Sequence, residues 1–198
     1  MSILINPKSV NPRRTKNQSG FTIIEILVVV LMVGIVGAIA APTWIMFANR
    51  QKVRTVNDRV FNAIQRAQSQ AQLTSLGHSL EFGEHGGIPA YRIYLTSKGR
   101  PSDDNADWQT LDVNGEINEG QITLRVFAPV DDNILKFDHL GVIEREQDPE
   151  QDPEKNITED NPFWVVVSSA DNSVTHCVAV RTRLLSTQKL QGDDCNPD

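Results

Sequence analysis

The sequence predicts an α+β protein, in which a long N-terminal α-helix packs on a C-terminal antiparallel β-sheet or β-sandwich head. Two observations support this prediction. Residues 21–41 are apolar almost without interruption. From Val53 to Ala71 apolar residues recur at three- and four-residue steps, which is the helical period. After Gly77 the apolar period changes to two, and short β-branched and aromatic runs alternate with turn residues. With 198 residues, the chain is long enough for one head domain and an extended element.

The first forty residues combine a basic start with a long apolar segment. Residues 1–20 contain four basic side chains and no acidic one, whereas residues 77–198 contain ten basic and 23 acidic ones. From Phe21 to Ala41 the only charged residue is Glu25. As a helix this segment would be about 31 Å long, which matches the roughly 30 Å hydrocarbon core of a bilayer. A basic segment before a first span favours a cytoplasmic N-terminus, although basic residues also follow the span (Arg50, Lys52 and Arg54).

The residues alone leave three interpretations of the apolar segment open. It can be a secretory signal, because Ala38-Ile39-Ala40 provides a small-residue cleavage site before Ala41. It can be an uncleaved anchor, which leaves Glu25 without a partner, although a charge at the bilayer centre costs about 2.5–3.5 kcal/mol. If the chain is instead cut between Gly20 and Phe21, the new α-amine lies four residues before Glu25, and the two charges can pair in a low dielectric.

The pattern Gly20-Phe21-Thr22-x-x-Glu25, followed by a long apolar helix, resembles the processing signal of type IV pilins and pseudopilins. The resemblance implies that a prepilin peptidase cleaves after Gly20 and N-methylates Phe21. It also implies that Glu25 is used in filament assembly. Pro42 lies where many pilins have a proline, and a helix break is expected there because Gly34 and Gly37 just before it also weaken the helix.

The function that this resemblance implies is that of a structural subunit, a minor pilin or pseudopilin of a type IV pilus or a type II secretion pseudopilus. The expected location is the inner membrane, with a single span and a periplasmic head, and then the filament. The expected partners are other pilin or pseudopilin subunits, prepilin peptidase, the inner-membrane assembly platform and, before assembly, the lipid bilayer.

The apolar pattern resumes beyond Pro42. Apolar residues recur at helical spacing, and polar residues face away from them. The apolar residues are Val53, Val56, Val60, Ile64, Ala67 and Ala71, and the polar ones are Arg50, Lys52, Arg54, Asn57, Gln65 and Gln68. We therefore predict an amphipathic helix at 43–76, continuous or kinked with the span. Residues 21–76 would extend about 84 Å if straight, so half of this helix requires lipid or other helices to cover it.

Six runs in the rest of the chain predict strands: Ser79–Phe82, Tyr91–Leu95, Gln121–Phe127, Ile134–Phe137, Phe163–Ser168 and Val174–Leu185. The segment from Val56 to Phe82, and a turn at Asp138-His139-Leu140-Gly141 between two strands, are similar to the FimT/GspH-type minor pilins. The predicted organisation is a leader peptide at 1–20, a transmembrane and filament-core helix at 21–42, an amphipathic helix at 43–76 and a β-rich globular head at 77–198.

The segment from Glu144 to Asp160 is strongly acidic, with eight acidic and two basic residues. It contains the tandem repeat Gln147-Asp148-Pro149-Glu150 and Gln151-Asp152-Pro153-Glu154. Because proline blocks strand pairing and like charges repel, we predict a flexible acidic loop at 144–160. Calcium binding is the sharper alternative, but the glycine-punctuated spacing of a calcium loop is missing. We therefore predict no metal site.

The two cysteines, Cys177 and Cys195, are 18 positions apart. If the head is extracytoplasmic, a disulfide is their natural state and would add about 3 kcal/mol in the loop-entropy model. Pilins often close their C-terminal region in this way. The alternative is two unrelated thiols.

No catalytic site is predicted. The four histidines (His78, His85, His139 and His176) lack the spacing of a zinc protease or a zinc finger. No nucleophile-elbow, Walker or dinucleotide-binding pattern occurs either. We expect no enzyme activity and no cofactor.

Three basic residues near the C-terminus suggest an alternative function. Arg181 and Arg183 alternate on a predicted strand, which places them on one face, and Lys189 is near. Some FimT-like proteins bind DNA for uptake through a Gly-Arg-x-Arg patch, in which Val180 replaces the glycine here. Phosphate contacts by two or three cations are weak, and the head is acidic, so an ordinary solvated strand edge is favoured over DNA contact.

Overall fold

The structure is a computed structural model, which describes residues 20–102, 107–112, 114–129, 134–144 and 156–196, without the side chains of 41–43. The predicted leader up to residue 19 and residues 145–155 of the predicted acidic loop lie outside the described residues. The chain divides into two compact units, residues 1–43 and 44–198.

The first element is a single long helix, α1 (Ile23–Thr74), of 52 residues. It begins two residues later than Phe21, because Thr22 caps its N-terminus. It ends at Thr74, two residues earlier than predicted, since Ser75 adopts a left-handed backbone conformation with φ 54°. Pro42 lies within α1, and the helix continues beyond it to Thr74. A helix break at Pro42 stays a prediction.

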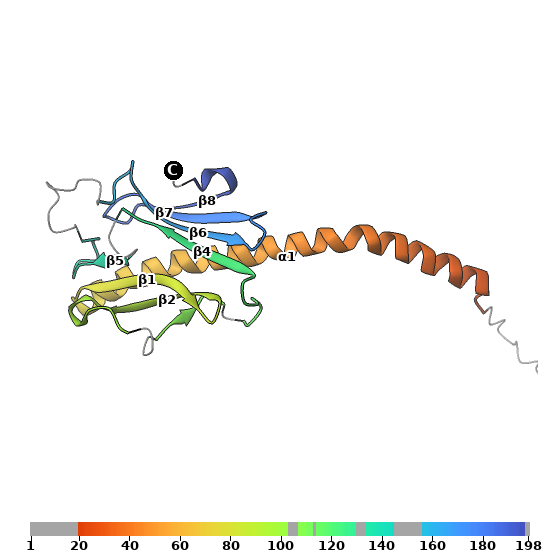
Figure 1. The fold of residues 1–198 in the computed structure, drawn as a ribbon, viewed down its shortest axis with the longest axis horizontal. Helices are drawn as coiled ribbons and strands as arrows, with labels where there is room; N and C mark the ends of the chain where they lie inside the picture. The colour runs from red at the N-terminus through yellow and green to blue at the C-terminus, as the bar shows by residue number, and fades with distance from the viewer. Residues whose placement is uncertain (1–19, 103–106, 113, 130–133, 145–155, 197–198) are drawn as a thin grey trace, which may run out of the picture. The chain divides into compact units, whose positions relative to one another are not determined.

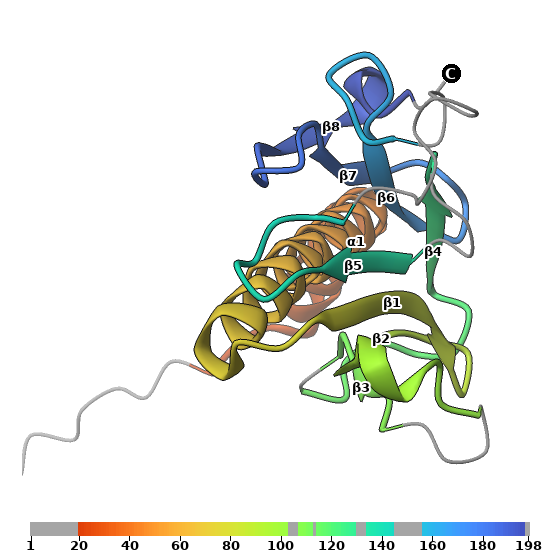
Figure 2. The ribbon, with the colours of Figure 1, turned by 90° about the vertical axis from the view of Figure 1, so that its left-hand side faces the viewer.

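Two four-stranded antiparallel sheets form the head. The first has the order β3-β2-β1-β5 and comprises β1 (His78–His85), β2 (Ile88–Leu95), β3 (Gln109–Thr110) and β5 (Ile134–Phe137). The second has the order β4-β6-β7-β8 and comprises β4 (Ile122–Phe127), β6 (Phe163–Ser169), β7 (Thr175–Val180) and β8 (Thr187–Gln191). Short 3-10 helices follow β2 (η1, Thr96–Lys98) and β8 (η5, Gly192–Asp194). Both sheets lie around the second half of α1, and β4 contacts β1 and β2 where the sheets meet (Figures 1 and 2). The predicted α+β fold class is confirmed.

The core lies between the apolar stripe of α1 and both sheets. The six apolar residues predicted to form that stripe are all buried and belong to one cluster with residues of both sheets, such as Leu80 of β1 and Val178 of β7. Every residue of β6 is buried. Asn57 was predicted to face away from the core, but it is buried. The prediction was wrong because the sequence pattern does not reveal β8, whose Lys189 contacts Asp58 and Phe61 on this flank of α1.

Five of the six predicted strands coincide with observed strands, and the sixth is too long. β7 ends at Val180, and a turn at residues 181–186 leads into β8. The turn is closed by the backbone N–H of Arg181, which donates to the carbonyl of Ser186 at 2.8 Å, and Leu185 adopts φ 66°. The sequence from Val174 to Leu185 is therefore a strand followed by a turn and not one strand.

Three basic side chains of α1 donate hydrogen bonds to β3 and to the segment between β3 and β4. Lys52 Nζ donates to the carbonyl of Glu116 at 2.6 Å, and Arg59 Nη1 donates to the carbonyl of Leu111 at 2.5 Å. Arg66 Nη1 donates to Gln109 Oε1 at 3.0 Å. These hydrogen bonds connect α1 to β3 and the segment that follows it, so the three side chains serve the fold of the head.

The predicted turn at residues 138–141 follows β5 and rests on the end of α1. Asp138 Oδ1 accepts hydrogen bonds from the backbone N–H groups of Leu140 and Val142, both at 2.9 Å. Gly141 adopts φ 74°, and a Cβ there would lie 2.8 Å from the side chain of Gln72. The strand expected after this turn is reduced to a bridge between Phe137 and Ile143.

Candidate processing and assembly site

The residues around the predicted cleavage bond lie outside the helix. Gly20, Phe21 and Thr22 have no regular secondary structure and are exposed, and the side chain of Phe21 is 77% exposed. No atom lies within 4 Å of the position that a Cβ would occupy on Gly20. A peptidase can therefore reach the Gly20–Phe21 bond without unwinding a turn of helix.

Thr22 and Glu25 form the N-terminal cap of α1. Thr22 Oγ1 accepts a hydrogen bond from the backbone N–H of Glu25 at 3.3 Å, and the Thr22 carbonyl accepts one from Ile26 at 3.2 Å. This combination of residue types at this spacing is that of a capping box. A carboxylate in the first turn is also stabilised by the helix dipole, typically by about 0.3–1 kcal/mol. The spacing of Thr22 and Glu25 is the sequence signal of this cap, a function of Thr22 that was not predicted.

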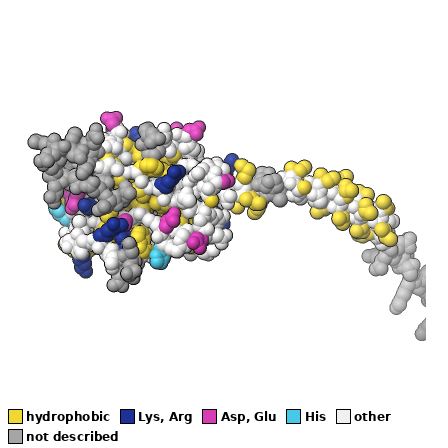
Figure 3. All heavy atoms as spheres, in the orientation of Figure 1, with side chains coloured by type: hydrophobic (Ala, Val, Ile, Leu, Met, Phe, Trp, Pro, Cys, Tyr) yellow, Lys and Arg dark blue, Asp and Glu magenta, His cyan; other side chains and the backbone are white. Residues whose placement is uncertain are grey.

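The apolar segment of α1 has no packing partner among the described residues. Every side chain from Phe21 to Ala40 is exposed, and yellow apolar side chains cover this part of the chain on the face seen in Figure 3. Within the part of the chain that the structure describes, α1 is the one helix long and apolar enough to cross a membrane, judged by length and composition. A helix that is apolar on all sides requires lipid or other helices around it.

Comparison with known families finds the same segment. A family model for the prokaryotic N-terminal methylation motif matches residues 15–41. The chain carries a type IV pilin-like processing signal. The match includes Gly20, Phe21 and Glu25 and stops before Pro42. No curated protein and no solved structure matches the chain.

The motif indicates a type IV pilin-like precursor that is processed by prepilin peptidase and assembles with other pilin subunits. The family of this motif is structural and not enzymatic. Together with the long apolar helix, the motif fits a membrane-anchored precursor.

The predicted disulfide is present in the head of this pilin-like precursor. Cys177 of β7 and Cys195, which follows η5, are bonded, with their Cα atoms 5.7 Å apart. The bridge packs with Trp164, Val166 and Leu190 in a small second core. It ties the C-terminal end of the described chain to the second sheet.

The three cations predicted as DNA contacts do not share a strand face. Arg181 and Arg183 lie in the turn after β7, so the prediction that they alternate on one strand is wrong. Arg183 Nε donates to the carbonyl of Ile143 at 2.8 Å, and Lys189 Nζ lies 2.9 Å from Asp58 Oδ1. DNA contact by these residues stays a prediction that has lost its geometric basis.

The four histidines lie in separate places. His78 is buried beside the carbonyl of Leu76, 3.0 Å from its Nδ1, and His85 and His139 are exposed. His176 of β7 faces α1. Among the described residues, no three His, Cys, Asp or Glu side chains gather where they could hold a metal ion.

Proposed function

We propose that this chain is a minor pilin or pseudopilin, a structural subunit of a type IV pilus or a type II secretion pseudopilus. The observation that carries the proposal is the exposed apolar segment of α1, which lies within the matched N-terminal methylation motif. Such a helix is stable in lipid before assembly and against similar helices after it. The proposed location of the precursor is the inner membrane, with one span and a periplasmic head, and an assembly platform would draw the trimmed subunit into the filament.

The connection between α1 and the first strand of the head supports a subunit of the FimT/GspH type. In that group the long helix passes directly into the first strand, and here α1 ends at Thr74 and β1 begins at His78. The disulfide of the head is typical of proteins that fold outside the cytoplasm.

In this proposal, Glu25 brings subunits together by forming an ion pair with the α-amine of Phe21 that cleavage exposes. Because α1 begins at Ile23, Phe21 precedes the helix, and its amine could lie one turn from Glu25 of the same chain only if two more residues became helical. A neighbouring subunit has no such restriction. We therefore infer that the amine of one subunit pairs with Glu25 of the next, in a low dielectric where an ion pair is much stronger than in water.

Glu25→Ala is expected to leave membrane insertion and trimming intact but to stop incorporation into filaments. The reason is that the amine of the neighbouring subunit would enter the apolar filament core without a counter-charge. The measurement is the amount of the trimmed variant in sheared or purified filaments, compared with its amount in the membrane fraction.

Glu25→Gln separates the two functions of this residue. Glutamine is accepted at the same position of a capping box, so it preserves the local cap but removes the charge. We expect this variant to fail in assembly as Glu25→Ala does. Normal incorporation of Glu25→Gln would show that the cap, and not the charge, is what assembly needs.

A further inference from the structure

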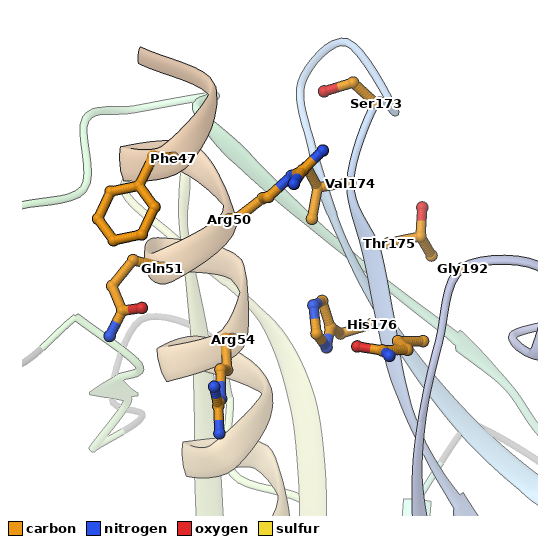
Figure 4. Close-up of a pocket in the computed structure, with 10 residues that line it drawn as sticks. Phe47, Arg50, Gln51, Arg54, Ser173, Val174, Thr175, His176 and Gly192 are labelled. Carbon is orange, nitrogen blue, oxygen red and sulfur yellow. The ribbon is translucent and has the colours of Figure 1, made fainter. Parts of the chain in front are cut away.

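An open groove of about 630 Å³ runs between α1 and the hairpin that joins β6 to β7. Arg50 and Arg54 of α1 line one wall, and Ser173, Thr175 and His176 line the other (Figure 4). In the close-up, Arg50 extends toward Val174, and the ring of His176 lies between the helix and Thr175. No acidic residue is among the described side chains that line this groove, so it is a cationic surface on a head that is otherwise acidic.

The two arginines of the groove are not used by the fold. Neither side chain forms a hydrogen bond or an ion pair with any described residue, in contrast to Lys52, Arg59 and Arg66 of the same helix. A second cavity continues the groove toward Asp58 and Lys189, which pair with each other at 2.9 Å. Arg54 lines both cavities, and Arg50 lines only the first, so the cationic end of the groove is the one that Phe47 lines.

Large apolar side chains lie next to this cationic end. Trp44, Ile45, Met46 and Phe47 are all at least half exposed, and the rings of Trp44 and Phe47 are 6.0 Å apart. They follow the apolar segment directly in sequence, and Arg50 comes one helical turn after Met46. Tryptophan is enriched at the boundary between lipid tails and headgroups, and arginine side chains near helix ends extend to the headgroups.

We propose that this groove binds the phosphodiester headgroup of an anionic membrane lipid, held by Arg50 and Arg54 while Trp44 and Phe47 contact its acyl chains. Guanidinium groups bind phosphate oxygens through charge-assisted hydrogen bonds, and the hydroxyls of Ser173 and Thr175 are further donors. The inference rests on the membrane-anchored state in the proposed function and goes beyond it. It also explains why basic residues follow the span, where the charge rule for a periplasmic head disfavours them.

His176 provides a reporter inside the groove. Burial lowers the pKa of His176, the neighbouring Arg54 lowers it further, and Asp58 opposes these effects in part. The other charged groups around this end of the two cavities are Arg50, Lys189 and Asp194. A phosphate bound beside Arg54 would offset the positive charge near the imidazole, so it would raise the pKa of His176.

The experiment uses the full chain in non-ionic detergent micelles, titrated with short-chain phosphatidylglycerol. We expect saturable binding and an upward shift of the His176 pKa, both followed by the NMR signals of the imidazole ring. Arg50→Gln and Arg54→Gln are each expected to weaken binding by about tenfold, since a hydrogen bond between charged groups is lost in each. The matched control, Arg125→Gln with Lys136→Gln, removes two exposed positive charges elsewhere on the head and should bind as the unaltered chain does.

Two further titrations test the source of the phosphate. Phosphatidylcholine of the same chain length and inorganic phosphate are both expected to bind at least tenfold more weakly than phosphatidylglycerol. Equal binding of phosphatidylcholine would overturn the choice of an anionic lipid, and equal binding of inorganic phosphate would overturn the choice of any lipid. Unchanged phosphatidylglycerol binding by the Arg50/Arg54 double variant would overturn the site. Trimming and assembly do not enter this test, so its failure is separate from a failure of the proposed function.

Discussion

A chain with Gly20→Val is expected to accumulate in the membrane as the untrimmed precursor. A prepilin peptidase has to bring the Gly20–Phe21 bond against its reacting groups, and a misplacement of about 1 Å can slow such a step on the order of 100-fold. A branched side chain next to the bond prevents that close approach. The measurement is the ratio of precursor to trimmed chain on a gel, in cells that contain the peptidase.

Loss of trimming in Gly20→Val can be distinguished from misfolding, because the surroundings of Gly20 are open. A side chain at Gly20 would meet no atom within 4 Å, so the substitution leaves the chain's own contacts intact. Gly34 is equally open and lies within α1, so Gly34→Ala is a matched control that should be trimmed normally. Normal trimming of Gly20→Val would contradict cleavage at this bond.

Glu81→Ala is expected to lower the free energy of unfolding of the head by about 3–5 kcal/mol, the usual effect of removing one partner of a buried ion pair. Glu81 of β1 lies directly opposite Arg92 of β2, and both side chains are nearly inaccessible to solvent. Glu81 Oε2 accepts from Arg92 Nε at 2.8 Å, and Glu81 Oε1 accepts from Arg100 Nη2 at 2.5 Å. The guanidinium of Arg92 also lies 4.5 Å from the ring centre of Trp108.

The loss would be large because the buried guanidinium of Arg92 loses the Glu81 carboxylate and stays buried. Typical domains are stable by only about 5–15 kcal/mol, so the variant should unfold at a much lower denaturant concentration. The measurement is chemical denaturation of the full chain in detergent micelles with the disulfide intact. Glu84→Ala is the matched control, since Glu84 is an exposed residue of the same strand. Equal stability of the Glu81 and Glu84 variants would contradict a structural function of the buried pair.

The elements that the sequence predicts correctly are those in which one residue type repeats at a fixed spacing. The buried stripe of α1 was found because valines, isoleucine and alanines recur at helical steps, and β6 because its residues are continuously apolar. The processing signal was recognised from Gly20-Phe21-Thr22-x-x-Glu25 before a long apolar run, and the family model matches residues 15–41; cleavage after Gly20 stays a prediction. The disulfide followed from the presence of two cysteines in a head expected outside the cytoplasm.

The remaining features depend on contacts between segments that are distant in sequence. β8 is short and polar, so nothing in its own residues indicates a strand. The burial of Asn57 depends on β8, which lies beside this part of α1. Arg92 lies in an alternating run that places it on the outer face of the sheet, and the segment that contains Trp108 buries it there. The groove likewise joins residues of α1 to residues more than one hundred positions later. Local periodicity carries no information about such pairings.

Intact mass spectrometry of the chain extracted from its native membrane tests the central claim most directly. The account predicts a polypeptide that begins at Phe21, carries one additional methyl group on its amine and contains a disulfide between Cys177 and Cys195. A polypeptide that begins at Met1, or at Ala41 after loss of the apolar segment, would contradict it.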